Sequence, residues 1–125
     1  MQSAVDYQAL AARFDTPEVK AIVLMGSHAR GDAGPYSDVD LVRFVEDGQD
    51  ALVGAGSHLI DERLVVISNV TRAEVETWFT QPAVAVKNVV GVRKARAIID
   101  RDETFASIQT RAQTFTWDEN LQLQA

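Results

Sequence analysis

The sequence predicts an α/β (α+β) fold in which helices pack on one mixed β-sheet. Apolar, β-branched stretches typical of buried strands alternate with segments whose apolar residues recur at helical spacing. The connection over residues 26–37, between the first two expected strands, is too short for a full parallel crossover and indicates a mixed or antiparallel sheet. With 125 residues, 46% of them hydrophobic, the chain has the length and apolar content of one domain.

The first expected elements are a helix and two strands. Ser3 can cap a helix that runs through about Phe14, and Asp6 stands three residues after the cap, where a capping box places an acidic residue. The apolar runs Val19–Met25 and Val39–Val45 predict the two strands. We expect the helix to pack on their sheet, because its apolar residues gather near one face.

The middle of the chain gives a weaker pattern. A helical turn is expected at Asp50–Ala55, and one strand within residues 59–70, best at Arg63–Ser68. The segment Thr71–Glu74 has the pattern of a capping box and predicts a helix to about Phe79.

Three elements are expected in the last third. Pro82 suits the first turn of a helix that Gly91 stops, and Lys94–Ile99 predicts an edge-like strand. A final helix is expected to begin at Asp102 or Glu103. Its apolar residues at helical spacing are Phe105, Ile108, Ala112 and Phe115.

Charge and composition exclude several classes of protein. The chain has 18 acidic and 12 basic residues, a net charge of −6, which argues against extended binding to nucleic acid or to an anionic membrane. It has no cysteine, so disulfides and thiolate metal sites are excluded. No apolar run approaches the roughly 20 residues of a membrane span, and the N-terminus lacks a signal-peptide pattern. We therefore expect a cytoplasmic protein.

The connection between the first two strands carries the residues that predict a site. Gly26 lets the backbone turn sharply after the first strand, and Ser27 can then start a short helix through about Arg30 that ends at Gly31. Free N–H groups at such a start, beside a residue without a side chain, form an anion site. Phosphate is the anion that we expect there.

Two carboxylates follow at the start of the second strand. Asp38 and Asp40 are two residues apart, so both side chains leave one face of the strand while Val39 and Leu41 leave the other. Carboxylates this close repel each other, and either a raised pKa or a bound cation relieves the repulsion. Beside a phosphate site, Mg²⁺ is the expected cation. Alternatively, Asp38 is a turn residue and Asp40 a solvated strand residue.

The segments Gly26–Gly31 (Gly-Ser-His-Ala-Arg-Gly) and Ser37–Leu41 (Ser-Asp-Val-Asp-Leu) together resemble the signature of the DNA polymerase β-type nucleotidyltransferase superfamily. The similarity is closest to its small bacterial members, the aminoglycoside and lincosamide nucleotidyltransferases and the minimal nucleotidyltransferases paired with toxins. The resemblance implies a nucleotidyltransferase fold and a nucleotidyltransferase domain over residues 1–116. The tail, residues 117–125, is then either the start of a missing helical domain or a frayed terminus.

The resemblance also implies a site and a reaction. Asp38 and Asp40 would be catalytic and would bind one or two Mg²⁺ that bridge a nucleoside triphosphate such as ATP, while Gly26 and Ser27 hold its phosphates. Arg30 would neutralise phosphate charge, unless it is a solvated arginine. A hydroxyl of an acceptor, either a small antibiotic-like molecule or a protein, would take the nucleoside monophosphate and release pyrophosphate.

One position departs from the family pattern. The superfamily usually has a third carboxylate in the middle of a neighbouring strand, where this sequence has valine, near Val66. Asp61 or Glu62 could replace it from the start of that strand, although both are also typical of a solvated turn. Two hypotheses follow. The chain is a Mg²⁺-dependent enzyme, or it is a catalytically degenerate module that binds a nucleotide or a helical partner; a homodimer is compatible with both.

Other conspicuous residues are expected to be structural. His28 and His58 lack a second histidine at ligand spacing, so both are expected to be non-catalytic. Trp78 and Phe79 are expected in the core, with stacking on a nucleobase as the alternative. The basic residues of the last third are expected to form a solvated face, with docking of a partner or acceptor as the alternative: Lys87, Arg93, Lys94, Arg96 and Arg101.

Overall fold

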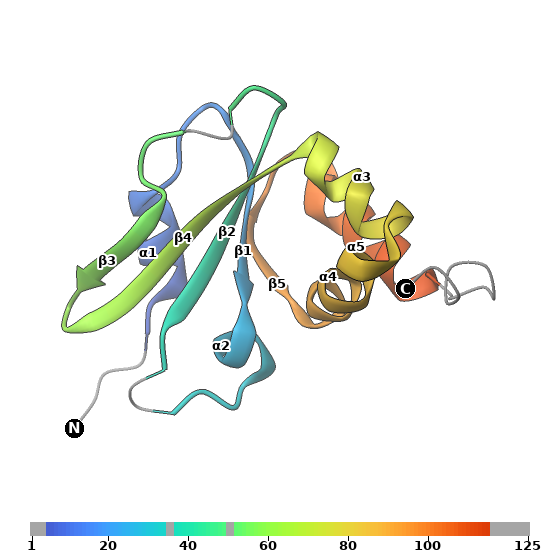
Figure 1. Ribbon diagram of the computed structural model, residues 1–125. Coiled ribbons are helices and arrows are strands. Elements are labelled where there is room, and N and C mark those ends of the chain that lie inside the picture. The colour runs from blue at the N-terminus through green and yellow to red at the C-terminus, as the bar shows by residue number, and fades with distance from the viewer. Residues whose placement is uncertain (1–4, 35–36, 50–51, 116–125) are drawn as a thin grey trace.

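A computed structural model of the chain shows five strands in one sheet with helices packed against it (Figure 1). The structure describes residues 5–34, 37–49 and 52–115, without the side chains of residues 82–87. The strands are β1 (Val19–Met25), β2 (Val39–Val45), β3 (Gly56–Ile60), β4 (Arg63–Thr71) and β5 (Arg96–Asp100). The helices are α1 (Tyr7–Arg13), α2 (Gly26–Arg30), α3 (Arg72–Thr80), α4 (Pro82–Lys94) and α5 (Thr104–Thr114), with a 3₁₀ turn η1 (Arg101–Glu103). The predicted fold class is confirmed.

The strands lie in the order β3-β4-β2-β1-β5. Only β2 and β4 pair in parallel; the other neighbours are antiparallel, as the short connection between β1 and β2 predicted for that pair. The register forms a row across the sheet, in which Met25 lies opposite Asp40, Asp40 opposite Val66, and Val66 opposite Ser57. Directly paired residues share a face of a sheet, so these four side chains leave the same side.

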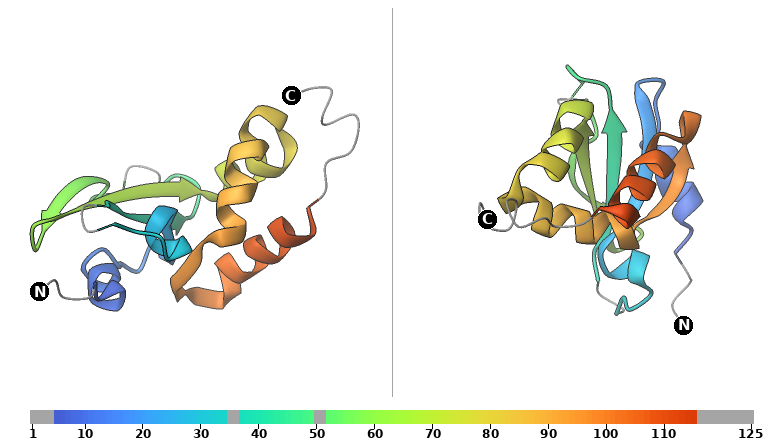
Figure 2. Two further views of the ribbon diagram at one scale, coloured as in Figure 1. Left: turned by 90° about the horizontal axis from the view of Figure 1, so that it is seen from below. Right: turned by 90° about the vertical axis from the view of Figure 1, so that its right-hand side faces the viewer.

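Two hydrophobic cores lie on the two faces of the sheet. In the right-hand view of Figure 2, α3 and α4 lie on one side of the strands and α1 on the other. The core under α1 includes Leu10, Phe14, Ile22, Leu24, Val39, Leu41, Val65 and Ile67. The core under α3, α4 and α5 includes Ala21, Val23, Phe44, Val75, Trp78, Phe79, Val89 and Phe105. The predicted packing of the first helix on the sheet and the core positions of both aromatic residues of α3 are confirmed.

The first helix is shorter than predicted. It begins at Tyr7, because Asp6 is its N-cap and accepts a hydrogen bond from the backbone N–H of Ala9 at 3.0 Å. The expectation that the helix starts after Ser3 is therefore wrong at its start, and Ser3 itself lies outside the described residues. A carboxylate at the N-cap satisfies an orphan backbone donor as well as a serine does.

The third predicted strand is a hairpin of two strands. Asp61 and Glu62 form the two-residue turn between β3 and β4, with φ of +50° and +63°. Two left-handed residues match the twist of paired strands, but the usual signal for such a turn is Asn-Gly or Asp-Gly, and positions 61–62 carry Asp-Glu instead. Before β3, the helical turn predicted at Asp50–Ala55 is not helical over residues 52–55, and its first two residues lie outside the described part.

The capping box before α3 is confirmed. The Thr71 hydroxyl accepts from the backbone N–H of Glu74, and the Glu74 carboxylate accepts from the backbone N–H of Thr71. α4, however, continues through Gly91 to Lys94, so the predicted stop is wrong. Gly91 faces β1 at close range, and a Cβ added there would lie 3.3 Å from Cε of Met25. The glycine serves helix packing instead of ending the helix.

The last elements lie close to their predicted places. β5 is an edge strand next to β1, and α5 begins at Thr104 after η1. The start of α5 is held by Asp100, whose carboxylate accepts from the backbone N–H groups of Phe105 (2.7 Å) and Ala106 (2.9 Å). None of the helices within the described residues is long and apolar enough to cross a membrane. The expected tail, residues 117–125, lies outside the described part of the chain.

Candidate functional site

The site predicted by the sequence is built where β1 ends against β2. Because the two strands are antiparallel, the C-terminal end of β1 lies beside the N-terminal half of β2, with Met25 opposite Asp40. Gly26 follows directly, at φ +73°, and a Cβ placed on it would lie 2.9 Å from Oδ2 of Asp40. A Cβ at that distance would displace the carboxylate, so the glycine permits its close approach.

The short helix α2 carries the glycine and serine of the first signature segment. It spans Gly26–Arg30, one residue earlier than the predicted start at Ser27, and no side chain caps its N-terminus. It ends as predicted at Gly31, which takes the left-handed conformation at φ +82°, and the backbone N–H of Asp32 bonds to the Ser27 carbonyl at 3.1 Å. The helix therefore presents Gly26 beside Asp40, with Ser27 next in the chain.

The two carboxylates lie in different surroundings. Val39 and Leu41 are buried under α1, whereas Asp38 is exposed and Asp40 half-buried, which matches the predicted alternation of faces. Burial raises the pKa of Asp40, and the negative charge of Asp38 raises it further, while the field of His28 acts in the opposite direction. A bound cation would remove this penalty on the charged form of Asp40.

His28 is a structural link in the site. Its buried ring contacts the Tyr7 hydroxyl through Nδ1 at 2.7 Å and the Ser37 carbonyl through Nε2 at 3.2 Å. Since a carbonyl only accepts, Nε2 is the donor, and Nδ1 of the neutral ring then accepts from Tyr7. The expectation that His28 does no chemistry is compatible with this geometry, but no sequence pattern indicates its contact with Tyr7, which lies 21 residues earlier.

Two cations flank the glycine on its other side. A cavity of about 260 Å³ between α2 and α4 is lined by Gly26, Arg30, Val90, Gly91 and Lys94. Arg30 is exposed and pairs through Nε with Asp32 at 3.3 Å, in a surface ion pair that costs little to break. Lys94 was expected on a solvated face, and its position beside Gly26 could not be read from the sequence. Together the two side chains give this hollow a positive charge that suits phosphate.

The site has few side chains that could bind a metal ion. Within residues 5–34, 37–49 and 52–115, no cluster of three or more His, Asp or Glu side chains could hold a metal ion. Val66 lies opposite Asp40 in the row across β2 and β4, on the same face, so the valine occupies a position from which a third carboxylate would reach the pair. Asp38 and Asp40 alone fit a cation that takes its remaining ligands from substrate phosphates and water, as Mg²⁺ usually does.

The two acidic residues considered as substitutes lie in the hairpin turn. Asp61 and Glu62 are exposed and hold the left-handed conformations that close β3 onto β4. Their observed place is thus the solvated turn that the sequence offered as the alternative.

Three other residues singled out in the sequence have structural contacts, Arg96 is exposed, and the side chain of Lys87 lies outside the described part of the chain. His58 bonds through Nε2 to the Gly54 carbonyl at 2.7 Å. Arg93 donates to backbone carbonyls at the end of α5, and Arg101 forms a two-point ion pair with Asp15 at 2.6 and 2.8 Å. Both arginines hold elements together; Arg93 is half-buried, whereas Arg101 is exposed, as the expected solvated face requires.

The mixed sheet and its signature segments define an α+β domain of the polymerase β-type nucleotidyltransferase superfamily. The nucleotidyltransferase domain family matches residues 8–109, most of the chain, so the chain belongs to this family. No curated protein matches the sequence.

Two solved structures are similar to the chain. A nucleotidyltransferase-like protein from Exiguobacterium sibiricum is 18% identical with a TM-score of 0.59, over 88% of this chain and 37% of that protein. This chain therefore matches little more than a third of that protein, and the similarity concerns the fold. A toxin–antitoxin structure with AMP-PNP is 12% identical with a TM-score of 0.47, over 86% of this chain and 83% of the other.

Proposed function

We propose that this domain transfers a nucleoside monophosphate from a Mg²⁺-bound nucleoside triphosphate, such as ATP, to a hydroxyl of a small molecule or a protein. The observation that carries the proposal is the packing of Asp40 against Gly26, at a distance where a Cβ would displace the carboxylate. Arg30 and Lys94, which line a cavity with Gly26, support a phosphate site next to Asp40. Membership of the nucleotidyltransferase domain family supports the reaction class.

The residues have distinct roles in this proposal. Asp38 and Asp40 hold the Mg²⁺, Gly26 and Ser27 let the phosphates approach the backbone, and Arg30 neutralises phosphate charge. Mg²⁺ supplies charge stabilisation for the attacking and leaving oxygens. The acceptor oxygen bonds to the α-phosphorus, the bond from that phosphorus to the bridging oxygen breaks, and pyrophosphate leaves with the electron pair. The hydroxyl proton goes to water, because the position of a third carboxylate is Val66.

Calorimetry with ATP tests the nucleotide site first. The parent should bind ATP only with Mg²⁺, and Asp40→Asn should weaken binding by more than the roughly 10- to 100-fold that loss of a group merely supporting a metal ligand costs. Asp102→Asn is the matched control, since Asp102 is an exposed acid in η1 and asparagine accepts its left-handed backbone. Equal ATP affinity in the parent and in Asp40→Asn would remove the proposed site.

Transfer is tested separately with ATP labelled at the α-phosphate. Purified chain, Mg²⁺ and a panel of polyhydroxylated small molecules and proteins should yield labelled adduct, and Asp38→Asn and Asp40→Asn should abolish it. Label that persists in both variants would reject the assignment of these carboxylates.

The valine in the row beside Asp40 favours a second candidate, a degenerate module that binds nucleotide without transfer. A missing metal ligand or base reduces transition-state stabilisation more than ground-state binding. Val66→Asp distinguishes the two, with Val66→Asn as the control of similar shape. Transfer that appears only in Val66→Asp would support the degenerate module, whereas efficient transfer by the parent would exclude this second candidate.

A further inference from the structure

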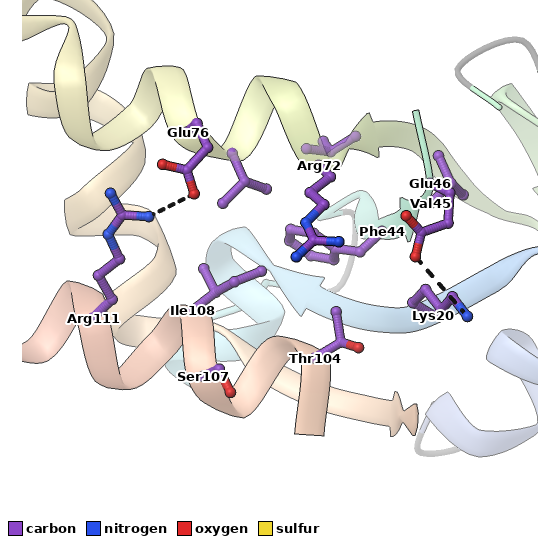
Figure 3. Close-up of a pocket in the computed structure, with 12 residues that line it drawn as sticks. Lys20, Phe44, Val45, Glu46, Arg72, Glu76, Thr104, Ser107, Ile108 and Arg111 are labelled. Carbon is purple, nitrogen blue, oxygen red and sulfur yellow. Dashed lines mark hydrogen bonds and ion pairs between the residues drawn. The ribbon is translucent and has the colours of Figure 1, made fainter. Parts of the chain in front are cut away.

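A second hollow lies at the other end of the sheet from the carboxylate pair. It measures about 380 Å³ and is bounded by α3, α5 and the ends of β1, β2 and β4 (Figure 3). On β2 it begins at Phe44, four residues beyond Asp40, which corresponds to roughly 13 Å along a strand. Neither carboxylate of the proposed transfer site lines it, so it is a separate feature of the fold.

The hollow has an apolar floor. Phe44 and Val70 rise from the sheet, Val75 comes from α3 and Ile108 from α5. The size falls within the range of 300–1,000 Å³ typical of small-molecule sites, which are mostly apolar with a few placed polar groups.

Ion pairs close both ends of the hollow. Arg111 of α5 meets Glu76 of α3 at 2.8 Å, and Lys20 of β1 approaches Glu46 at 4.0 Å, as the dashed lines in Figure 3 mark. Each pair is neutral as a whole. Their long side chains lie on the rim, so a ligand between them would face one positive and one negative group at either end.

Arg72 carries a positive charge that no acidic residue of the pocket lining balances. Figure 3 shows its side chain extending from α3 toward the middle of the pocket. Among the described residues it makes no hydrogen bond or ion pair, although its field, with the larger effect of Arg111, holds the pKa of Glu76 below its usual value. The lining therefore carries one net positive charge, on a guanidinium whose planar donors suit a carboxylate.

We propose that this pocket binds a compact apolar molecule with a single carboxylate, independently of the proposed transfer site. The apolar floor takes the body of the ligand, and Arg72 pairs with its carboxylate. A phosphate monoester fits less well, because its second negative charge would meet Glu46 and Glu76.

Binding of benzoate, followed in amide NMR spectra, tests the proposal. Benzoate should shift the amide signals of α3 and α5 around Arg72 and Ser107 in a saturable way, and the neutral isostere benzamide should bind at least about 10-fold more weakly. Arg72→Gln should weaken benzoate binding by a similar factor. Arg96→Gln removes one charge from an exposed arginine on β5, outside the pocket, and should leave the affinity unchanged.

Three results would overturn the proposal: no saturable shift with benzoate, equal binding of benzamide, or unchanged affinity in Arg72→Gln. Phenyl phosphate tests the alternative class of ligand. If it binds more tightly than benzoate, the ligand of the pocket is a phosphate and not a carboxylate. Ser107→Phe fills the pocket from α5 and should abolish benzoate binding while the remaining amide pattern shows that the chain is folded. Signals of Gly26–Arg30 respond to Mg²⁺-ATP in the same spectra, so failure of either site is recognised separately.

Discussion

The hydroxyl of Tyr7 on α1 lies 2.7 Å from Nδ1 of His28 on α2. Through Nε2 the same ring holds the Ser37 carbonyl, one residue before the carboxylate pair begins. Three segments that are distant in sequence are thus joined by one buried imidazole. We therefore expect the position of Asp38 and Asp40 relative to Gly26 to depend on this link, and Tyr7→Phe tests it.

The Tyr7→Phe variant should lose about 1 kcal/mol of unfolding free energy, because a hydrogen bond is removed while the ring is kept. Mg²⁺-ATP binding should weaken with it, since the segment before Asp38 is less firmly held. Urea unfolding and calorimetry measure the two effects. Thr114→Val, which removes an exposed hydroxyl on α5, should stay within about 0.5 kcal/mol of the parent. Parent-like unfolding and ATP affinity in Tyr7→Phe would contradict the role of the link.

Asp40→Asn should raise the melting temperature at neutral pH while it removes nucleotide binding. Burial, with the charge of Asp38, raises the pKa of Asp40 in the folded chain. The unfolded chain therefore releases this proton at lower pH, and the charged carboxylate opposes folding once the pH exceeds the native pKa. The gain in stability should vanish below about pH 3, where Asp40 is protonated in both states. Thermal melts of parent and variant across pH, without Mg²⁺, measure the difference, and a variant that melts lower than the parent at neutral pH would contradict it.

Gly26→Ala and Gly31→Ala separate backbone strain from crowding of the carboxylate. Both glycines have positive φ, so each alanine should cost about 1–2 kcal/mol. Only at position 26 does the new Cβ meet Asp40, whereas nothing lies within 4 Å at position 31. Denaturation should therefore show a loss in Gly26→Ala at least as large as in Gly31→Ala, while calorimetry should show lost Mg²⁺-ATP binding in Gly26→Ala alone. Equal ATP affinity in the two variants would mean that the close approach has no role.

Arg43→Met should lower the unfolding free energy by on the order of 3 kcal/mol. The guanidinium is 1% exposed and donates to Asn69 and to the carbonyls of Phe14, Leu52 and Val53, at 2.8–3.1 Å. Methionine fills the space but leaves these acceptors without their donor. Arg96→Met, at an exposed position, should change stability by less than about 0.5 kcal/mol. The free energies of urea unfolding of the parent and both variants show whether the Arg43 hydrogen bonds, beyond the burial of the side chain, stabilise the fold.

Asp15→Asn should destabilise the protein at neutral pH but not in acid. The hydrogen bonds from Arg101 hold the pKa of Asp15 below its usual value. The resulting stability is present above the unfolded pKa, near 4, and is lost as the pH falls through the lower native pKa. Melting curves of parent and variant should converge at low pH, with Asp102→Asn as the control that follows the parent throughout.

Much of the fold could be predicted because its signals are local. The bounds of β1 and β2 follow from apolar runs that are buried on both faces, and the start of α3 follows from a reciprocal cap within four residues. The hairpin between β3 and β4 was missed because acidic residues occupy its left-handed positions, and α4 was cut short because Gly91 serves packing. The structural role of a glycine or of an acidic pair depends on its tertiary contacts.

Part of the candidate site could likewise be predicted from local sequence, and part could not. Its carboxylates and glycine turn lie in one contiguous segment, so their spacing predicts that they meet. The contacts of His28 with Tyr7, and of Lys94 with the hollow beside Gly26, join residues far apart in sequence and arise only from packing. A single sequence carries no record of such contacts.

The charged residues of β2 also disfavour pairing of this strand in a wrong register. Asp40 leaves one face of the strand, and Arg43, three residues on, leaves the other into a buried set of carbonyls. A slip of one residue would turn Asp40 into the apolar layer under α1 and remove the cation from its acceptors. A slip of one residue therefore leaves two charges without compensation, so residues that the folded domain needs also disfavour this misaligned pairing.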